Sequence, residues 1–274
     1  KNAKDEEKQE EFNDQALAYD FGDVSKYIEE SNKEIYGKND RVGKFLNLKD
    51  ADLYYEVYGE GEPLFLLHGN SGSIKDFYQQ IPELSKQYQV IVMDTRSQGK
   101  STDKTKKDFN YKIFADDVKA LARHLNLKKI NIAGWSDGGN TGLEFALKYP
   151  ESLNKLITIG ANAFPEGVDK DLTENFMIKY KVSQLENKPE SFNQGRLLKL
   201  MLKEPKITDK QLNKIQNKVL VIAGEKDVIT LEHTQFLAKQ MPNSELKIYK
   251  DATHMIPFEN AEQLNQDILD FMKK

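Results

Sequence analysis

The sequence predicts an α/β protein built on one large, mostly parallel β-sheet. Short apolar runs, each long enough for a buried strand, alternate with segments of helical spacing along most of the 274 residues. Glycine-rich segments follow directly after two of these runs, and residues 161–217 break the alternation with helical pieces alone. Alternating elements imply right-handed crossovers and helices on both faces. We therefore expect an eight-stranded sheet with a helical cap inserted between two strands.

The composition narrows the function classes. The net charge of −4 is spread over interspersed acids and bases, which argues against nucleic acid or an anionic membrane as the main partner. Cysteine is absent, so neither a disulfide framework nor a thiolate nucleophile is expected. The four histidines include no helically paired set, so we expect no metal and no other cofactor. The apolar runs are far shorter than the roughly 20 residues of a membrane span, so we expect no transmembrane segment.

Residues 1–40 read as a polar N-terminal arm. They open with a dense run of charges, and the apolar residues between Phe12 and Ile28 are too irregular for a defined helix, although they could dock a short one on the body. The sequence starts at Lys1 rather than Met. Loss of a leader would place the protein outside the cytoplasm, which we favour; a shortened cytoplasmic chain is the alternative.

The first half of the core begins with a predicted hairpin and continues with three strands. Glycine-rich residues follow the strand over 63–67 and present free backbone N–H groups, the material of an oxyanion hole. The predicted elements in chain order are the hairpin Lys44–Leu48 and Ala51–Tyr58, strand Pro63–Leu67, an amphipathic segment Asp76–Gln87, strand Gln89–Met93, helix Tyr111–Leu125 and a strand from Ile130.

That last strand runs straight into Gly134-Trp-Ser-Asp-Gly-Gly139 and then into a helical segment. A strand, a tight turn and a helix around Gly-x-Ser-x-Gly are the context of a nucleophile elbow, which would place Ser136 at the tip of the turn. The glycines supply room where strand and helix nearly touch. The five residues alone also fit an ordinary glycine-rich turn. We expect Trp135 to pack under the sheet.

The second half returns to the alternating pattern after the insertion. We divide the chain into a core of residues 41–160 and 218–274 and a cap of residues 161–217. The predicted elements are strand Leu153–Ile159, cap helices Leu172–Leu185 and Ser191–Leu202, strand Lys218–Ala223, helix Leu231–Gln240, strand Ser244–Tyr249 and helix Ala261–Met272.

A serine needs a base and an orienting carboxylate to act as a nucleophile. His124 and His233 fall inside predicted helices and His68 starts the glycine-rich loop, which leaves His254, in a loop after the last strand, as the base. A loop histidine of no consequence is the alternative. Asp227 follows the strand ending at Ala223 and is the expected acid; its neighbour Glu225 competes, but more naturally turns the loop.

With these motifs in place, the chain resembles the α/β-hydrolase superfamily from about Lys44 to Phe271. The matching residues are His68-Gly69, Asp94-x-Arg96-x-x-Gly99-x-Ser101, Gly134–Gly139, Gly224-Glu-Lys-Asp227 and His254. The elbow, together with Lys148-Tyr-Pro150 and Gly160–Phe164, is similar to the biphenyl-hydrolase-like or valacyclovir-hydrolase-like serine esterases. The chain departs from the pattern at Ser97, where glycine is usual, and at Ile229-Thr230, which replace a common proline.

The resemblance implies a serine hydrolase that cleaves a small-molecule carboxylic ester through an acyl-enzyme. Ser136 would attack, His254 would take its proton, and Asp227 would hold the imidazole. The oxyanion would be bound by the backbone N–H groups of Asn70 and Asp137. Because only the backbone of Asn70 would be used, its replacement by alanine is expected to have little effect unless its side chain also touches substrate.

Other functions remain open on the same residues. A perhydrolase, a C–C hydrolase or an aminopeptidase could use the same triad, and a non-catalytic binding or receptor protein could use the same fold. A haloalkane dehalogenase is disfavoured because Ser136, not Asp137, holds the elbow position. The Asp137 carboxylate itself has two interpretations: it complements the N-terminus of the following helix, or it faces the pocket and favours substrates with a cationic group, such as α-amino acid esters.

Overall fold

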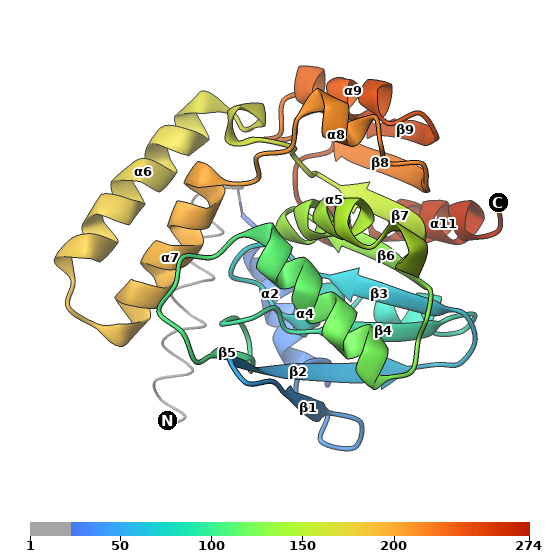
Figure 1. The fold of residues 1–274 in the computed structure, drawn as a ribbon, viewed down its shortest axis with the longest axis horizontal. Helices are drawn as coiled ribbons and strands as arrows, with labels where there is room; N and C mark the ends of the chain where they lie inside the picture. Colours follow the sequence, from blue (N-terminus) through green and yellow to red (C-terminus); the bar gives the residue numbers. More distant parts are fainter. Residues whose placement is uncertain (1–22) are drawn as a thin grey trace.

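The computed structural model describes residues 23–274, and Figure 1 shows a twisted mixed sheet flanked by helices on both faces. Eight strands lie in the order β1-β2-β4-β3-β6-β7-β8-β9, and β5 pairs with the edge of β2. The pairs β1–β2, β2–β4 and β2–β5 are antiparallel, and the others are parallel. The strands are β1 Lys44–Asn47, β2 Ala51–Tyr58, β3 Pro63–Leu67, β4 Gln89–Met93, β5 Thr102–Asp103, β6 Ile130–Trp135, β7 Leu153–Ile159, β8 Lys218–Gly224 and β9 Ser244–Tyr249. This confirms the predicted fold class.

Helices cover both faces of the sheet, and two long helices lie beyond it. None of those formed by residues 23–274 is long and apolar enough to span a membrane. Short 3₁₀ turns lie at Ile74–Phe77, Pro150–Ser152 and Pro165–Gly167. The helices are α2 Ser25–Lys33, α3 Ile81–Leu84, α4 Tyr111–His124, α5 Asp137–Lys148, α6 Lys170–Leu185, α7 Pro189–Lys203, α8 Asp209–Leu212, α9 Leu231–Gln240, α10 Ile256–Glu259 and α11 Ala261–Met272.

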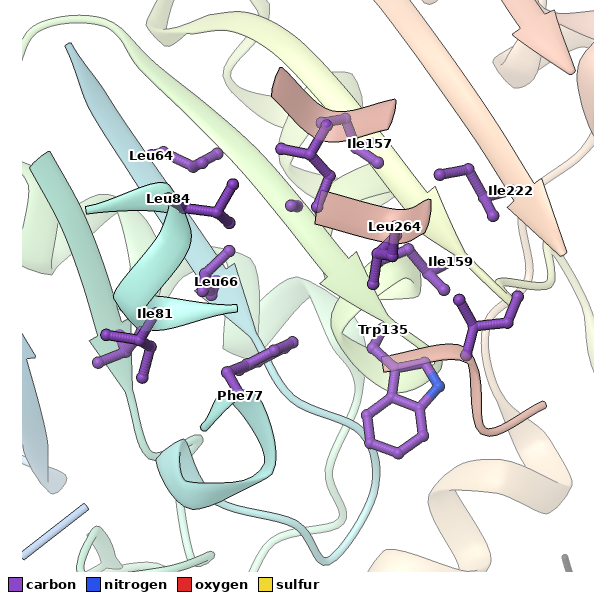
Figure 2. Packing of buried hydrophobic residues seen from close by; sticks show 14 of the residues in the cluster. Leu64, Leu66, Phe77, Ile81, Leu84, Trp135, Ile157, Ile159, Ile222 and Leu264 are labelled. Carbon is purple, nitrogen blue, oxygen red and sulfur yellow. The ribbon is translucent and has the colours of Figure 1, made fainter. Parts of the chain in front are cut away.

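The central strands are buried on both faces because successive side chains point to opposite sides of the sheet. On β3, Leu64 and Leu66 join one cluster with α2, α3 and α11, while Phe65 and Leu67 join another with α4, α5 and α9. Figure 2 shows the first cluster, in which Trp135 lies under the carboxyl end of β6. Both layers therefore hold β3 and β6 rigidly, and the loops at their carboxyl ends start from fixed points.

The insertion between β7 and β8 contains the two long helices that the sequence predicts. Asp169 accepts hydrogen bonds from the first-turn N–H groups of α6, and Pro189 opens α7. The two helices run side by side beyond the sheet (Figure 1). Leu197 and Leu200 of α7 pack on Phe109 and on Tyr111 and Phe114 of α4. The cap is thereby attached to the core next to the start of α5.

Three local elements were not located by the sequence pattern. Helix α2 is the short docked helix that the sequence allowed within the arm without locating it, and Val24 and Ile28 are buried against the core. The segment 76–87 is only a short helix between turns, and β5 is a two-residue strand with no apolar pattern to announce it. The division into arm, core and cap stays a prediction, and residues 1–22 of the arm lie outside the described part.

A buried carboxylate anchors the segment that follows α2. Glu56 on β2 has no exposed surface and accepts hydrogen bonds from the Gly37 and Asn39 N–H groups at 2.8 and 3.1 Å. It also accepts from the hydroxyls of Tyr54 and Tyr58 at 2.5 and 2.8 Å. Four donors compensate the burial of one charge, which otherwise costs several kcal/mol.

Glu56→Gln is expected to destabilise the fold by about 2 to 4 kcal/mol. The amide NH₂ group would replace one carboxylate oxygen and face two hydrogen-bond donors, which leaves buried groups unpaired. Urea unfolding followed by circular dichroism measures the change. The same substitution at exposed Glu60 is the control and should alter the free energy of unfolding by less than about 0.5 kcal/mol. Equal values for the two variants would show that the Glu56 contacts contribute nothing to stability.

Candidate active site

Ser136 occupies a sharp turn between β6 and α5. Its φ and ψ are 56° and −118°, a conformation that side-chain-bearing residues rarely adopt. The Ser136 N–H donates to Ile159 O at 2.7 Å, which fixes the turn to β7. A Cβ on Gly134 would lie 2.2 Å from Gly138 O, and one on Gly138 would lie 2.1 Å from Leu67 O. Bulk is therefore excluded on both sides of the serine, as the sequence pattern predicts.

The structure brings Ser136, His254 and Asp227 together from the carboxyl ends of three strands. His254 Nε2 lies 3.0 Å from Ser136 Oγ, and His254 Nδ1 lies 2.7 Å from Asp227 Oδ1. Asp227 also accepts the N–H groups of Ile229 and Gly224. Burial alone would raise the pKa of Asp227, but His254 and these N–H groups hold it below its ordinary value. The ionised acid favours a proton on Nδ1, which leaves Nε2 to accept from the serine hydroxyl.

The backbone of the His254 loop is held from below by Trp135. The indole Nε1 donates to His254 O at 2.9 Å, and the ring packs edge-on against Phe258. Trp135 thus lies under the sheet, as predicted from its sequence position, and it also fixes the main chain of the base. The hydrogen bond could not be inferred from the sequence because the two residues are far apart in the chain.

The other residues weighed for the base and the acid have different partners. His233 Nε2 accepts the Ala163 N–H, and burial lowers the pKa of His233 to about 4. His124 is exposed on α4. Glu225 accepts the Asp251 N–H at 2.8 Å and so turns the loop. These side chains hold local structure and make no contact with Ser136 within the described residues.

The glycine-rich loop after β3 passes directly over the serine. A Cβ added to Gly69 would lie 3.3 Å from Ser136 Cβ. Within residues 23–274, the backbone N–H groups of Asn70 and Asp137 donate to no other protein group. Unpaired N–H groups beside a nucleophile are what an oxyanion hole requires. The two residues named from the sequence therefore lie on the two segments that flank Ser136.

A buried histidine shapes this loop. His68 Nε2 accepts the Thr95 N–H at 2.9 Å, so the proton lies on Nδ1, which donates to Gly69 O at 2.7 Å. Burial lowers the pKa of His68 to about 4, so the ring stays neutral. The Ser71 N–H donates to Gln98 Oε1 at 2.8 Å. The loops after β3 and β4 are thereby tied together.

Asp137, the residue after the serine, is buried between two side chains. Its Oδ1 accepts from the Tyr111 hydroxyl at 2.7 Å, and its Oδ2 accepts from Asn70 Nδ2 at 2.9 Å. Burial raises the pKa of Asp137 to about 6, against the opposing effect of Tyr111, Asn70 and His254. Burial also raises the pKa of Tyr111 well above its ordinary value, which keeps the hydroxyl a donor.

Sequence reasoning missed Tyr111 as a site residue. It appeared only as the first residue of an amphipathic helix, and its aromatic ring fits the apolar side of that helix. A buried tyrosine requires a partner for its hydroxyl, which is the one signal that could have drawn attention to it. The partner itself depends on how α4 and α5 pack.

The chain is similar in sequence to a known family and to known proteins. A family model described as the alpha/beta hydrolase fold matches residues 62–204. The chain belongs to the α/β-hydrolase family. The human protein "Serine hydrolase BPHL" is 30% identical over 244 residues, covering 81% of this chain and 84% of that protein. The chain is therefore an enzyme of the hydrolase class.

Two further relatives carry more specific names. A hydrolase of Comamonas testosteroni named for 2-hydroxy-6-oxononadienedioate and 2-hydroxy-6-oxononatrienedioate is 27% identical over 276 residues, covering 84% of this chain and 96% of that protein. A solved structure of a thermophilic esterase from Thermogutta terrifontis superposes on this hydrolase with a TM-score of 0.69 at 25% identity, covering 84% of this chain and 98% of that one. The two names therefore specify different classes of compound.

The position of His254 depends on a glycine across the sheet edge. Gly160 has a φ of 62°, and a Cβ there would lie 2.8 Å from both Cε1 and Nδ1 of His254. Gly160→Ala is expected to displace the imidazole and reduce the hydrolytic rate about 100-fold, since misplacement by about 1 Å costs this much. Gly37 is the matched control, because its φ is 87° but a Cβ would meet only ordinary van der Waals contacts, the nearest at 3.5 Å. Steady-state kinetics on an ester should show near-normal turnover for Gly37→Ala; equal losses would contradict the steric reason.

Proposed function

We propose that this hydrolase cleaves a small-molecule carboxylic ester by way of an acyl-enzyme. The observation that carries the proposal is the chain of hydrogen bonds Ser136–His254–Asp227, with its serine between two unused backbone N–H groups. Nucleophilic acyl transfer needs these parts together: a hydroxyl, a base, an acid that orients the base, and donors for the oxyanion.

The reaction follows from this geometry. His254 Nε2 removes the proton as Ser136 Oγ attacks the carbonyl, and Asp227 stabilises the imidazolium that forms. The Asn70 and Asp137 N–H groups donate to the oxyanion, each typically contributing about 3 kcal/mol to the transition state. Collapse releases the alcohol with the proton from His254, and water repeats the sequence on the acyl-serine.

The names of the relatives support an ester as the substrate and leave one competing substrate class. A serine hydrolase and an esterase are among the similar proteins, which agrees with acyl transfer to Ser136. The Comamonas testosteroni relative is named for compounds with a keto group, so a C–C bond next to a carbonyl is the second candidate substrate. Both chemistries need the same triad and differ in the leaving group.

Ser136→Ala is expected to lower the hydrolysis of p-nitrophenyl esters at least about 1000-fold, since the nucleophile is removed. A fluorophosphonate probe should label the wild-type protein at Ser136 and leave the variant unlabelled. Peptide mass spectrometry locates the adduct. Ser97, a polar residue of the neighbouring loop, provides the control as Ser97→Ala, which should be labelled normally. An adduct at any residue other than Ser136 would overturn the assignment of the nucleophile.

We further propose that the Asp137 carboxylate favours substrates with a cationic group near the scissile carbonyl. With a pKa of about 6 the carboxylate is mostly ionised at neutral pH. Each of its oxygens accepts one side-chain hydrogen bond, and a carboxylate offers about four lone-pair positions, so capacity for an ammonium group remains. An α-amino ester would place its ammonium group close to the residue that follows the nucleophile.

Asp137→Asn should reduce the kcat/KM ratio of an α-amino ester to its deaminated analogue about 10-fold, because the charge is removed. The deaminated analogue controls for structural damage, which affects both substrates. In the wild type the preference should fall as the pH drops through about 6, where Asp137 gains a proton. It should also fall above about 8, where an α-amino group loses one. An unchanged ratio in Asp137→Asn would exclude this role.

A further inference from the structure

Asn70 joins three separate parts of the molecule through one amide group. Its Nδ2 donates to Asp137 Oδ2 at 2.9 Å and to Leu197 O at 3.1 Å, and its Oδ1 accepts from Ser71 Oγ at 2.9 Å. Asn70 lies in the loop after β3, Asp137 begins α5, and Leu197 lies in cap helix α7. The amide therefore links both segments that flank Ser136 to the cap.

The link joins the two groups proposed to bind the oxyanion. Their N–H donors belong to Asn70 and Asp137, which stand on different segments with no backbone hydrogen bond between them in the described chain. A preorganised donor pair stabilises a transition state only if the donors keep their mutual position within a few tenths of an ångström. The side-chain bond from Asn70 to Asp137 holds that position.

Helix α7 meets this part of the core through one of its faces. Asn193 exchanges hydrogen bonds with Ser97 at 2.9 and 2.5 Å, and Arg196 pairs with Asp103 at 2.7 Å. Leu197 O is the next contact along the helix, and residues 193, 196 and 197 share a face at helical spacing. Of these three contacts, the one at Leu197 is made to Asn70, in the loop that passes over Ser136. The cap is thus connected to the oxyanion donors through Asn70.

We propose that the side chain of Asn70 is a positioning residue that couples the seating of cap helix α7 to the geometry of the oxyanion hole. The inference rests on the proposed function, since it assigns a role in acyl transfer. It also revises the expectation that Asn70→Ala has little effect, because the side chain holds Asp137 and the cap. The residue acts through backbone donors and touches no reacting atom with its side chain.

The test compares two asparagines that hold the same cap helix. Asn70→Ala is expected to lower kcat about 10- to 100-fold with KM changed less than about threefold, because donor geometry matters mainly in the transition state. Binding of an arylboronic acid, whose tetrahedral adduct presents an oxygen to the oxyanion hole, should weaken by a similar factor. Asn193→Ala removes the two cap hydrogen bonds to Ser97, which lie away from Ser136, and should change both quantities less than about threefold.

A second variant provides a signature in the pH profile. Asn70→Asp has the same shape but places a second carboxyl against Asp137 Oδ2, where paired carboxyls share a proton. The shared proton restores a donor at low pH. The ratio of variant to wild-type kcat should therefore rise as the pH falls from 8 to 6. The charged and titratable groups facing Asp137 are Tyr111 of α4 and His254, and both are present in each protein, so the ratio largely cancels their own titration.

The outcomes separate the two proposals. If the wild type hydrolyses no ester, the proposed function fails, and the rate of fluorophosphonate labelling then tests Asn70 in place of kcat. If wild-type activity is present, equal losses in Asn70→Ala and Asn193→Ala would mean that Asn70 only attaches the cap. A kcat of Asn70→Ala within threefold of wild type, or a flat ratio for Asn70→Asp, would likewise overturn the inference. Circular dichroism confirms that each variant is folded.

Discussion

The crowding around Ser136 is the constraint on which the rest of the site depends. Strand β6, strand β3 and helix α5 approach one another very closely. A Cβ on Gly134 would collide with the backbone of Gly138, and a Cβ on Gly138 would collide with the backbone of Leu67. A serine in a positive-φ conformation is costly, of order 1 to 3 kcal/mol, and persists only where its surroundings determine it. The hydrophobic clusters on the two faces of the sheet hold the turn in this conformation, since both β3 and β6 are packed on each face. The stability of the core is thereby used to hold one side chain at the sheet edge.

Buried polar side chains then fix the loops that follow the central strands. His68 is kept uncharged by burial, which lets one nitrogen accept and the other donate in a defined tautomer. Asp94 similarly accepts N–H groups of Ile74 and Lys100, and burial raises its pKa to about 7. The loops after β3 and β4 are joined by these groups rather than by regular structure. Loop residues around Ser136 therefore have little freedom, as preorganised donors require.

Elements and site residues that depend on a local sequence pattern could be predicted, whereas contacts that depend on tertiary packing could not. The strands, the main helices and the turn at Ser136 follow from periodicity and glycine spacing, and Asp227 and His254 follow from their places after strands. Tyr111 and the Asn70 amide could not be found this way, because their partners come from segments 26 and 127 positions away. Helix α2 was allowed as a short docked helix but its bounds were not predicted, because Val24 and Ile28 are too few to form a pattern and their burial depends on a core built from the rest of the chain.

Charge balance around the nucleophile connects Asp137 with the choice of substrate. In the proposed tetrahedral state, the oxyanion, Asp227 and Asp137 carry three negative charges, while imidazolium and the N-terminus of α5 supply the opposing ones. A buried carboxylate beside an oxyanion raises the energy of that state unless its charge is compensated. Tyr111 and Asn70 draw part of the Asp137 charge toward themselves. An ammonium group on the substrate would compensate the charge of Asp137 in the tetrahedral state, where the negative charge is greatest. Such a substrate should therefore have a higher kcat as well as tighter binding.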